Sequence, residues 1–398
     1  MRACIYRIVI AVVLVFLTQA VVCFGEGGDI VWEFNTHQCV WRSPVVCGRY
    51  VYVPSFMVTF PWLGGWNYLY CLKARTGKKV WVRTMWDEAF TTPAVIYGKV
   101  YVSGYGSHGW GYDTPGGDVY CFNALTGRKL WEFEPAGESS SSLPAVAYGY
   151  VYVTSDKRLY CLDAETGDEV WSVKFDSYVH WPSVSGGYVY TSVYSAKGDT
   201  LYCFNAHTGA KRWEIMIEGH HFHGRAIDGD ELYTLVIEIG GGSSYLLKLN
   251  TRTREKLWEV KVEDSDLVAG PSISNGYVYL GVIKEVWCID GDTGDKVWEF
   301  EADDYTGAPI VTRDYVYVNA TGRKFYCLDA WTGDEVWRFE REIGQDAPRF
   351  AVVSGGYVYV GASPMLYCLE AEEDEDGQWP MAGYNAGRTY ARPGGTGD

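Results

Sequence analysis

The chain has 398 residues, of which 16% are aromatic, with 46 glycines and a formal net charge of −16. This composition excludes a disordered chain, and the acidic charge argues against a nucleic-acid partner, because phosphate contacts need a basic surface. The length exceeds that of an ordinary single domain, so the sequence must encode several domains or one large repeat architecture.

The first 25 residues have the pattern of a targeting segment. Two arginines precede an apolar run from Ile8 to Leu17, and small residues follow it. The pattern predicts a secretory signal cleaved after Ala20, and an uncleaved anchor is the alternative because apolar residues continue to Phe24. We therefore expect residues 1–25 to be a signal peptide or signal anchor. The rest of the chain should be extracytoplasmic, secreted or membrane-anchored at the cell surface, with membrane contact only through an uncleaved N-terminal segment.

From residue 26 onward, one short stretch of sequence recurs. Its copy from Tyr160 to Trp171 reads YCLDAETGDEVW, which predicts two short strands joined by a Thr-Gly turn. The copies end in tryptophans spaced by 39 to 50 residues, at Trp32, Trp81, Trp131, Trp171, Trp213, Trp258, Trp298 and Trp337. Such spacing with all-β patterning is typical of four-stranded propeller blades. We expect an all-β, eight-bladed β-propeller over residues 26–371.

A glycine stands four residues before the tryptophan in six copies. A glycine fixed at this place supplies positive φ in a tight turn. The fifth copy has Arg254 there instead, so we expect that turn to be strained or differently shaped. The six glycines are Gly77, Gly127, Gly167, Gly209, Gly294 and Gly333.

The two ends of the repeat complete each other. The eighth unit ends in LYCLE (Leu366 to Glu370) without a tryptophan strand, whereas residues 30–34, IVWEF, form such a strand with no unit before it. Pairing the two segments would close the ring and remove an exposed sheet edge. Residues 372–398 begin with an acidic run and are expected to form a linker and a C-terminal extension.

Seven of the 11 cysteines recur at one position in the third strand of the blades. Neighbouring blades should place this position about 11 Å apart, beyond the roughly 7 Å that a disulfide spans. We expect these to be free, buried thiols: Cys71, Cys121, Cys161, Cys203, Cys288, Cys327 and Cys368.

Two long loops, residues 54–67 and 103–118, depart from the repeat and belong to neighbouring blades. Strand direction places them on the face that also carries the links between blades, where several histidines fall. The loop aromatics form either an exposed binding patch or a lid folded over the channel. The candidate binding residues are Phe56, Phe60, Trp62, Trp66, His108, Trp110, Tyr112, His180, His221 and His223.

The histidines are either metal ligands or ordinary loop residues beside the channel. His221 and His223 alternate, which would place both on one side of a strand, with His180 one blade away. The sequence has no His-x-x-x-His or Cys-x-x-Cys pattern, no nucleophile elbow and no phosphate loop. We therefore expect no catalytic residues and no metal ligands.

The motif Ala-x-x-Thr-Gly-x-x-x-Trp, seen from Ala164 to Trp171, resembles the repeat of the pyrroloquinoline-quinone-type (PQQ-like) propeller family, and a later segment, WPMAGYNAGRT, is similar to one common in that family. The resemblance implies that each tryptophan docks against the Ala-to-Gly turn of a neighbouring blade. It also implies either of two functions, because the family contains quinone-dependent dehydrogenases with Ca²⁺ and non-catalytic scaffolds of the outer-membrane assembly lipoprotein type. This chain lacks the adjacent cysteines typical of the eight-bladed dehydrogenases.

These observations favour an exported, non-catalytic scaffold that binds other envelope or surface proteins and needs no cofactor. A quinone-dependent oxidoreductase holding PQQ with Ca²⁺ is one alternative. A carbohydrate-binding propeller is another, because tyrosine and tryptophan side chains stack on sugar rings and glycans are then the partners.

Overall fold

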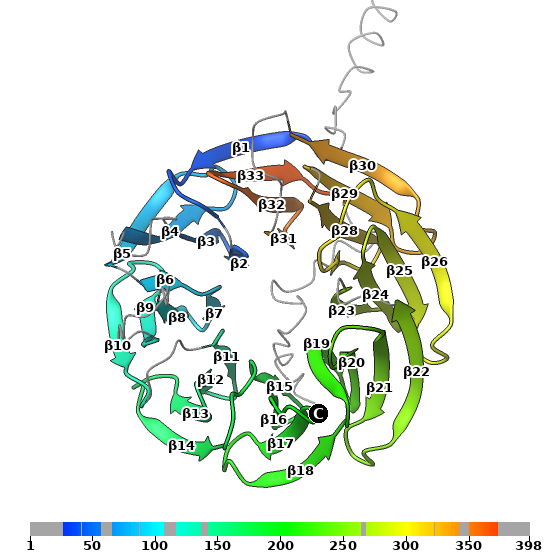
Figure 1. Ribbon diagram of the computed structural model, residues 1–398. Helices are drawn as coiled ribbons and strands as arrows, with labels where there is room; N and C mark the ends of the chain where they lie inside the picture. Colours follow the sequence, from blue (N-terminus) through cyan, green and yellow to red (C-terminus); the bar gives the residue numbers. More distant parts are fainter. Residues whose placement is uncertain are drawn as a thin grey trace, which may run out of the picture.

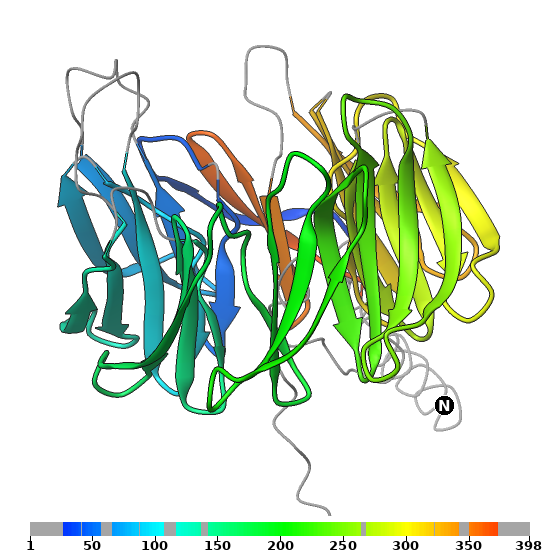
Figure 2. The same cartoon turned by 60° about the horizontal axis from the view of Figure 1, so that its bottom comes forward.

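Eight antiparallel sheets surround a central axis in the computed structural model (Figure 1). The structure describes residues 27–40, 42–56, 66–86, 88–106, 117–136, 142–263, 268–321, 323–341 and 350–372. Strands run between two faces of the ring (Figure 2). The loop face carries the links between blades and the connections between second and third strands; the turn face carries the remaining tight turns. The predicted eight-bladed propeller is confirmed.

The blades follow the chain in order, and the strand nearest the axis comes first in blades 1 to 8 (Figure 1). Blades 1 and 2 consist of β2 (Val45–Cys47), β3 (Tyr50–Ser55), β4 (Trp66–Lys73) and β5 (Lys79–Trp86), then β6 (Glu88–Phe90), β7 (Ala94–Ile96), β8 (Lys99–Gly106), β9 (Val119–Asn123) and β10 (Lys129–Phe133). Blades 3 and 4 consist of β11 (Ala145–Ala147), β12 (Tyr150–Ser155), β13 (Arg158–Asp163) and β14 (Glu169–Lys174), then β15 (Ser183–Ser185), β16 (Tyr188–Val193), β17 (Thr200–Asn205) and β18 (Lys211–Met216).

The second half of the ring repeats this arrangement. Blades 5 and 6 consist of β19 (His220–Asp228), β20 (Glu231–Glu238), β21 (Ser244–Asn250) and β22 (Lys256–Glu263), then β23 (Val268–Ser274), β24 (Tyr277–Val282), β25 (Glu285–Asp290) and β26 (Lys296–Glu301). Blade 7 consists of β27 (Ile310–Val311), β28 (Tyr315–Ala320), β29 (Lys324–Asp329) and β30 (Glu335–Glu340). Blade 8 consists of β31 (Phe350–Ser354), β32 (Tyr357–Ala362), β33 (Met365–Glu370) and β1 (Ile30–Asn35).

The N-terminal strand closes the ring, as the sequence predicts. β1 pairs antiparallel with β33, and Trp32 lies opposite Cys368. In Figure 1 the two ends of the described chain, blue and orange-red, meet in this blade. The pairing gives blade 8 its fourth strand.

The hydrophobic core lies between the blades. Each second strand buries valine or leucine on one face and a tyrosine on the other, as in Val151 and Tyr152, because alternate residues of a strand face opposite sides of the sheet. The seven recurring cysteines are buried and none of them forms a disulfide, which confirms the prediction for them. Burial raises the pKa of the Cys161 thiol to about 12, so it behaves as a small apolar group.

The tryptophans dock against the turn of the next blade. The indole Nε1 donates to a backbone carbonyl there, and a second-strand tyrosine donates to the same oxygen in several blades; for example, Trp81 and Tyr52 both donate to Ala124 O, at 2.9 and 3.2 Å. The seven indole–carbonyl pairs are Trp32–Ala74, Trp81–Ala124, Trp131–Ala164, Trp171–Ala206, Trp213–Thr251, Trp258–Gly291 and Trp298–Ala330.

The turn glycines are required by backbone conformation and by packing. All six have positive φ, and a Cβ on Gly167 would come within 2.7 Å of Trp131. Arg254 also adopts positive φ, +68°, which is unfavourable for a residue with a Cβ, so the predicted strain at this turn is confirmed. The turn keeps its shape nevertheless, since Trp213 still reaches Thr251 O at 2.9 Å.

Trp337 differs from the pattern that the family resemblance implies. Blade 8 has no Thr-Gly turn for it, and among the described residues its buried Nε1 has no hydrogen-bond acceptor. Gly27 and Gly28 cover its ring instead, and Gly28 N–H donates to Glu370 O at 2.9 Å. The N-terminal end of the chain therefore substitutes for the missing turn.

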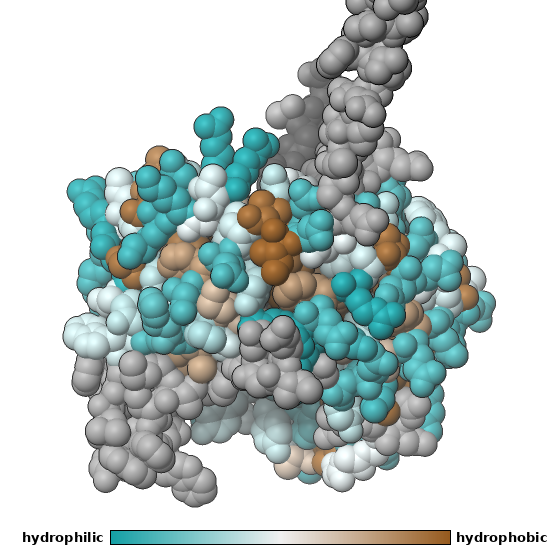
Figure 3. All heavy atoms as spheres, turned by 90° about the horizontal axis from the view of Figure 1, so that it is seen from above, coloured by the Kyte–Doolittle hydropathy of each residue, from teal (hydrophilic) through white to brown (hydrophobic). Residues whose placement is uncertain are grey.

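The outer wall is mostly hydrophilic on the side where β1 lies. Figure 3 views the side of the ring on which β1 lies and shows charged and polar residues with small hydrophobic patches between them. Within the described parts of the chain, no helix has the length and apolarity needed to cross a membrane.

Candidate functional site

Only part of the predicted loop surface falls within the described residues. Phe60, Trp62, His108, Trp110 and Tyr112 lie outside them, so the expectation of a shared aromatic surface there stays a prediction. Phe56 is half-buried and forms a bridge with Cys39, and Trp66, at the start of β4, is 48% exposed. Trp66 lies in blade 1, whereas the predicted histidines lie in blades 4 and 5 across the ring (Figure 1). The described candidates thus form two separate groups.

His180 and His221 meet at one buried carboxylate on the loop face. Asp199, directly before β17, is fully buried. Its Oδ1 lies 2.9 Å from His221 Nδ1, and its Oδ2 lies 3.5 Å from His180 Nε2. The backbone N–H groups of Ser195 and Phe222 donate to the same carboxylate at 3.2 and 3.0 Å. Three chain segments from two blades therefore converge on Asp199.

The environment of Asp199 favours its charged form. Burial alone would raise its pKa, but the two histidines and the N–H of Ser195 outweigh burial and hold the pKa below the ordinary aspartate value. His221 is further fixed by stacking on Tyr194, with ring centroids 5.0 Å apart and planes 17° from parallel. The carboxylate thus orients both imidazoles at the surface.

A buried arginine lies close to this group. Arg225, on the inner strand β19, is 5% exposed, and its Nη2 donates to Ser192 Oγ at 3.0 Å. Burial lowers its pKa to about 10, and the charge of Asp199 opposes that effect. Arg225 Nη1 is buried without a hydrogen-bond acceptor among the described residues. Buried donors are normally paired, so this atom is a candidate contact for a ligand or water.

Three exposed aromatic side chains surround the histidines. Tyr178, Trp181 and Tyr194, which we call the blade 4 patch, are 60%, 58% and 43% exposed. They lie on the link before β15 and the loop after β16, two segments joined by a bridge between Val179 and Val193. Tyr194 N–H also donates to Tyr178 O at 2.9 Å. The patch therefore sits on a hydrogen-bonded frame.

His223 lies two residues after His221 on β19. It follows Phe222, where the pairing of β19 with β20 shifts register, and its side chain is exposed. Sequence reasoning also missed Asp199, Arg225 and the blade 4 patch. The sequence offered one indication only: each of these residues occupies a position at which the repeat has no constant residue.

The described residues do not fit a calcium-held quinone. Ca²⁺ takes six to eight oxygen ligands, whereas Asp199, the fully buried carboxylate of this site, already accepts bonds from its protein neighbours. Within the described ranges, no group of three or more His, Cys, Asp or Glu side chains is placed to hold a metal ion.

Comparison with known proteins gives one family and two kinds of structural neighbour. The family described as "Outer membrane protein assembly factor BamB" matches residues 18–118, 115–235 and 242–364. The chain is similar to BamB from Moraxella catarrhalis, with a TM-score of 0.62 and 14% identity over 86% of this chain and 99% of that one. It is also similar to a europium-containing methanol dehydrogenase, with a TM-score of 0.60 and 14% identity over 84% and 85% of the two chains.

One curated relative is a serine/threonine-protein kinase, AfsK, from Streptomyces griseus. It is 31% identical over 142 residues, which are 32% of this chain and 18% of the kinase. The chain therefore spans less than a fifth of that relative. At these identities the structural neighbours establish the fold alone.

Proposed function

This chain belongs to the BamB family of PQQ-type repeat propellers, and from that premise we propose that it is an exported, non-catalytic scaffold that binds another envelope or surface protein. The blade 4 patch carries the proposal. Exposed tyrosine and tryptophan on an ordered frame are typical anchors of protein interfaces, since they bury a large area at a small loss of conformational freedom.

The polar group beneath the patch supports the same function. His180 and His221 are partly exposed beside the aromatic rings and are held by Asp199, and Arg225 Nη1 is buried without a hydrogen-bond acceptor among the described residues. An interface that covered the patch would also cover the exposed edges of the two imidazoles. The partner surface should therefore combine an apolar residue that packs on Trp181 with a carboxylate or carbonyl group.

The test is affinity capture from the native envelope with two variants. Trp181→Ser with Tyr178→Ser removes most of the patch, whereas Trp331→Ser with Tyr97→Ser removes aromatic side chains of similar exposure from the turn face. A partner retained by the native chain and the second variant and lost with the first supports the proposal. Equal capture by both variants, or no partner with any of them, would contradict it.

A glycan ligand is the second candidate, because the exposed rings of Trp181 and Tyr178 could stack on sugars beside the same polar groups. A glycan array decides between the two ligands. A signal that Trp181→Ser abolishes would favour the glycan, and its absence would leave the protein partner.

A further inference from the structure

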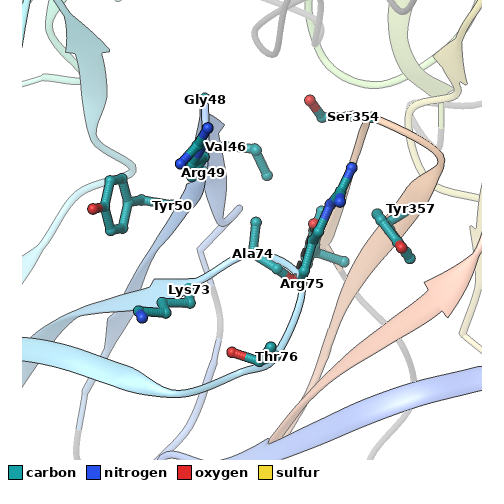
Figure 4. A pocket seen from close by; sticks show the side chains of 12 residues that line it. Val46, Gly48, Arg49, Tyr50, Lys73, Ala74, Arg75, Thr76, Ser354 and Tyr357 are labelled. Carbon is teal, nitrogen blue, oxygen red and sulfur yellow. Dashed lines mark hydrogen bonds between the residues drawn. The ribbon is translucent and has the colours of Figure 1, made fainter.

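A cavity of about 620 Å³ opens between blades 1 and 8 on the turn face, opposite the blade 4 patch. Figure 4 shows Arg49, Lys73 and Arg75 on the blade 1 side of this cavity, with Ser354 and Tyr357 on blade 8. The volume falls within the range of about 300–1,000 Å³ that is usual for small-molecule pockets. Three of its lining side chains are thus cations, in a chain whose net charge is −16.

Lys73 departs from the repeat at a position where most other blades have a side chain that caps the turn. The residue before the Ala-to-Gly turn is Asp or Asn in six blades, and its Oδ1 accepts two backbone N–H groups; Asp163, for example, accepts from Glu165 and Thr166 at 2.8 and 2.9 Å. The other five are Asn123, Asn205, Asn250, Asp290 and Asp329. Lysine has no acceptor, so blade 1 loses this turn stabilisation.

Arg49 and Arg75 place like charges where blades 5 and 7 place complementary groups and the remaining blades have a glycine at the position of Arg49. In blade 5 the corresponding residues are Asp230 and Arg252, whose side chains form an ion pair of 2.8 Å. In blade 7 they are Asp314 and Trp331, joined by a hydrogen bond of 3.3 Å. Blade 1 has an arginine at both positions, and two guanidinium groups repel each other unless an anion lies between them.

No carboxylate of this chain compensates these cations within the described residues. None of the three forms an ion pair there, whereas Lys99 of blade 2, at the position of Tyr50 in blade 1, pairs with Glu165. Packing therefore does not explain why blade 1 has Lys73 in place of the turn acceptor. It also does not explain why blade 1 has arginines at both position 49 and position 75. Both changes concentrate positive charge at one cavity.

We propose that this cavity binds an anionic small molecule, whose phosphate or carboxylate group lies between Arg49 and Arg75. The planar guanidinium groups match either anion in a bidentate manner, and Lys73 adds a third positive charge. Tyr50 and Tyr357, in the walls, offer ring surfaces for the rest of the molecule. The site is independent of the proposed function, because it lies on the other face of the ring.

The experiment is calorimetric titration of the full chain at low ionic strength with inorganic pyrophosphate and, separately, with citrate. The site variant is Arg49→Gly with Arg75→Glu, residues that other blades carry at these positions, as in Gly149 and Glu165. The control variant is Arg128→Gly with Arg313→Glu, which changes the charge equally on the turn face of blades 2 and 7. Far-UV circular dichroism checks that both variants keep the native fold.

We expect one equivalent of at least one probe to bind the native chain and the control variant, and at least tenfold weaker binding to the site variant. Binding of pyrophosphate alone would identify a phosphate ligand, and binding of citrate alone a carboxylate ligand. If neither probe binds, or if the two variants lose affinity equally, the proposal is wrong.

Discussion

The missing acceptor in the blade 1 turn gives a quantitative prediction for Lys73→Asp. In six blades an Asp or Asn side chain accepts two backbone N–H groups of the turn, whereas in blade 1 Thr76 N–H bonds to the Lys73 carbonyl at 3.2 Å. Each restored hydrogen bond contributes about 1 kcal/mol net, and less where water competes. Because this turn is exposed, we expect the free energy of unfolding to rise by about 1 kcal/mol in total.

Urea denaturation measures this change, and the control is Lys78→Asp. Lys78 lies in the same turn and is equally exposed, and its substitution changes the charge equally but offers no side chain at the capping position. The comparison separates the hydrogen bonds from relief of repulsion among the blade 1 cations. If both variants gain the same stability, charge explains the effect and the reasoning about the turn is refuted.

Three further outcomes follow from the fold. Arg254→Gly should raise the free energy of unfolding by about 0.5–1 kcal/mol, because it relieves positive φ; an unchanged urea midpoint would contradict the strain. Trp337→Phe should lower the free energy of unfolding by about 1 kcal/mol less than Trp131→Phe does, because only Trp131 has a hydrogen bond to lose, the one to Ala164 O. Equal decreases in the two variants would contradict this prediction. Asp199, whose pKa is lowered by folding, stabilises the native state above pH 3.8 and loses this effect as the pH falls through its folded value. The stability difference between the native chain and Asp199→Asn should therefore shrink below pH 3.8, which unfolding curves at several pH values would test.

The fold could be predicted because every blade repeats the same physical requirements. A tryptophan needs a carbonyl in the next blade, and the turn that offers it needs positive φ, so Trp131 and Gly167 fix one another across a blade boundary. The same regularity predicted the closing strand. The strand that contains Trp32 has no repeat unit before it, so it had to complete the last blade. Gly27 and Gly28 were not predicted, because two glycines near the start of a chain carry no periodic signal.

The candidate site was predicted only in part. The two histidines stood out because histidine is rare in this chain, with seven in total. Asp199 did not, since it is one of 50 acidic residues and its burial depends on how His180 and His221 approach it from separate segments. The basic cavity has the same character: Arg49 and Arg75 are unremarkable until the blades are superimposed and their neighbours compared.

Closure of the ring by β1 has a consequence for assembly. The contact between Thr36 and Pro364 joins residues 328 apart along the chain, so the last blade is completed only when the two ends of the propeller meet. Until then β33 presents an unpaired edge, and the free β1 strand of a second molecule is chemically identical to the strand that belongs there. Intramolecular and intermolecular closure therefore compete, and the concentration of unfolded chain sets the ratio of single rings to strand-exchanged pairs.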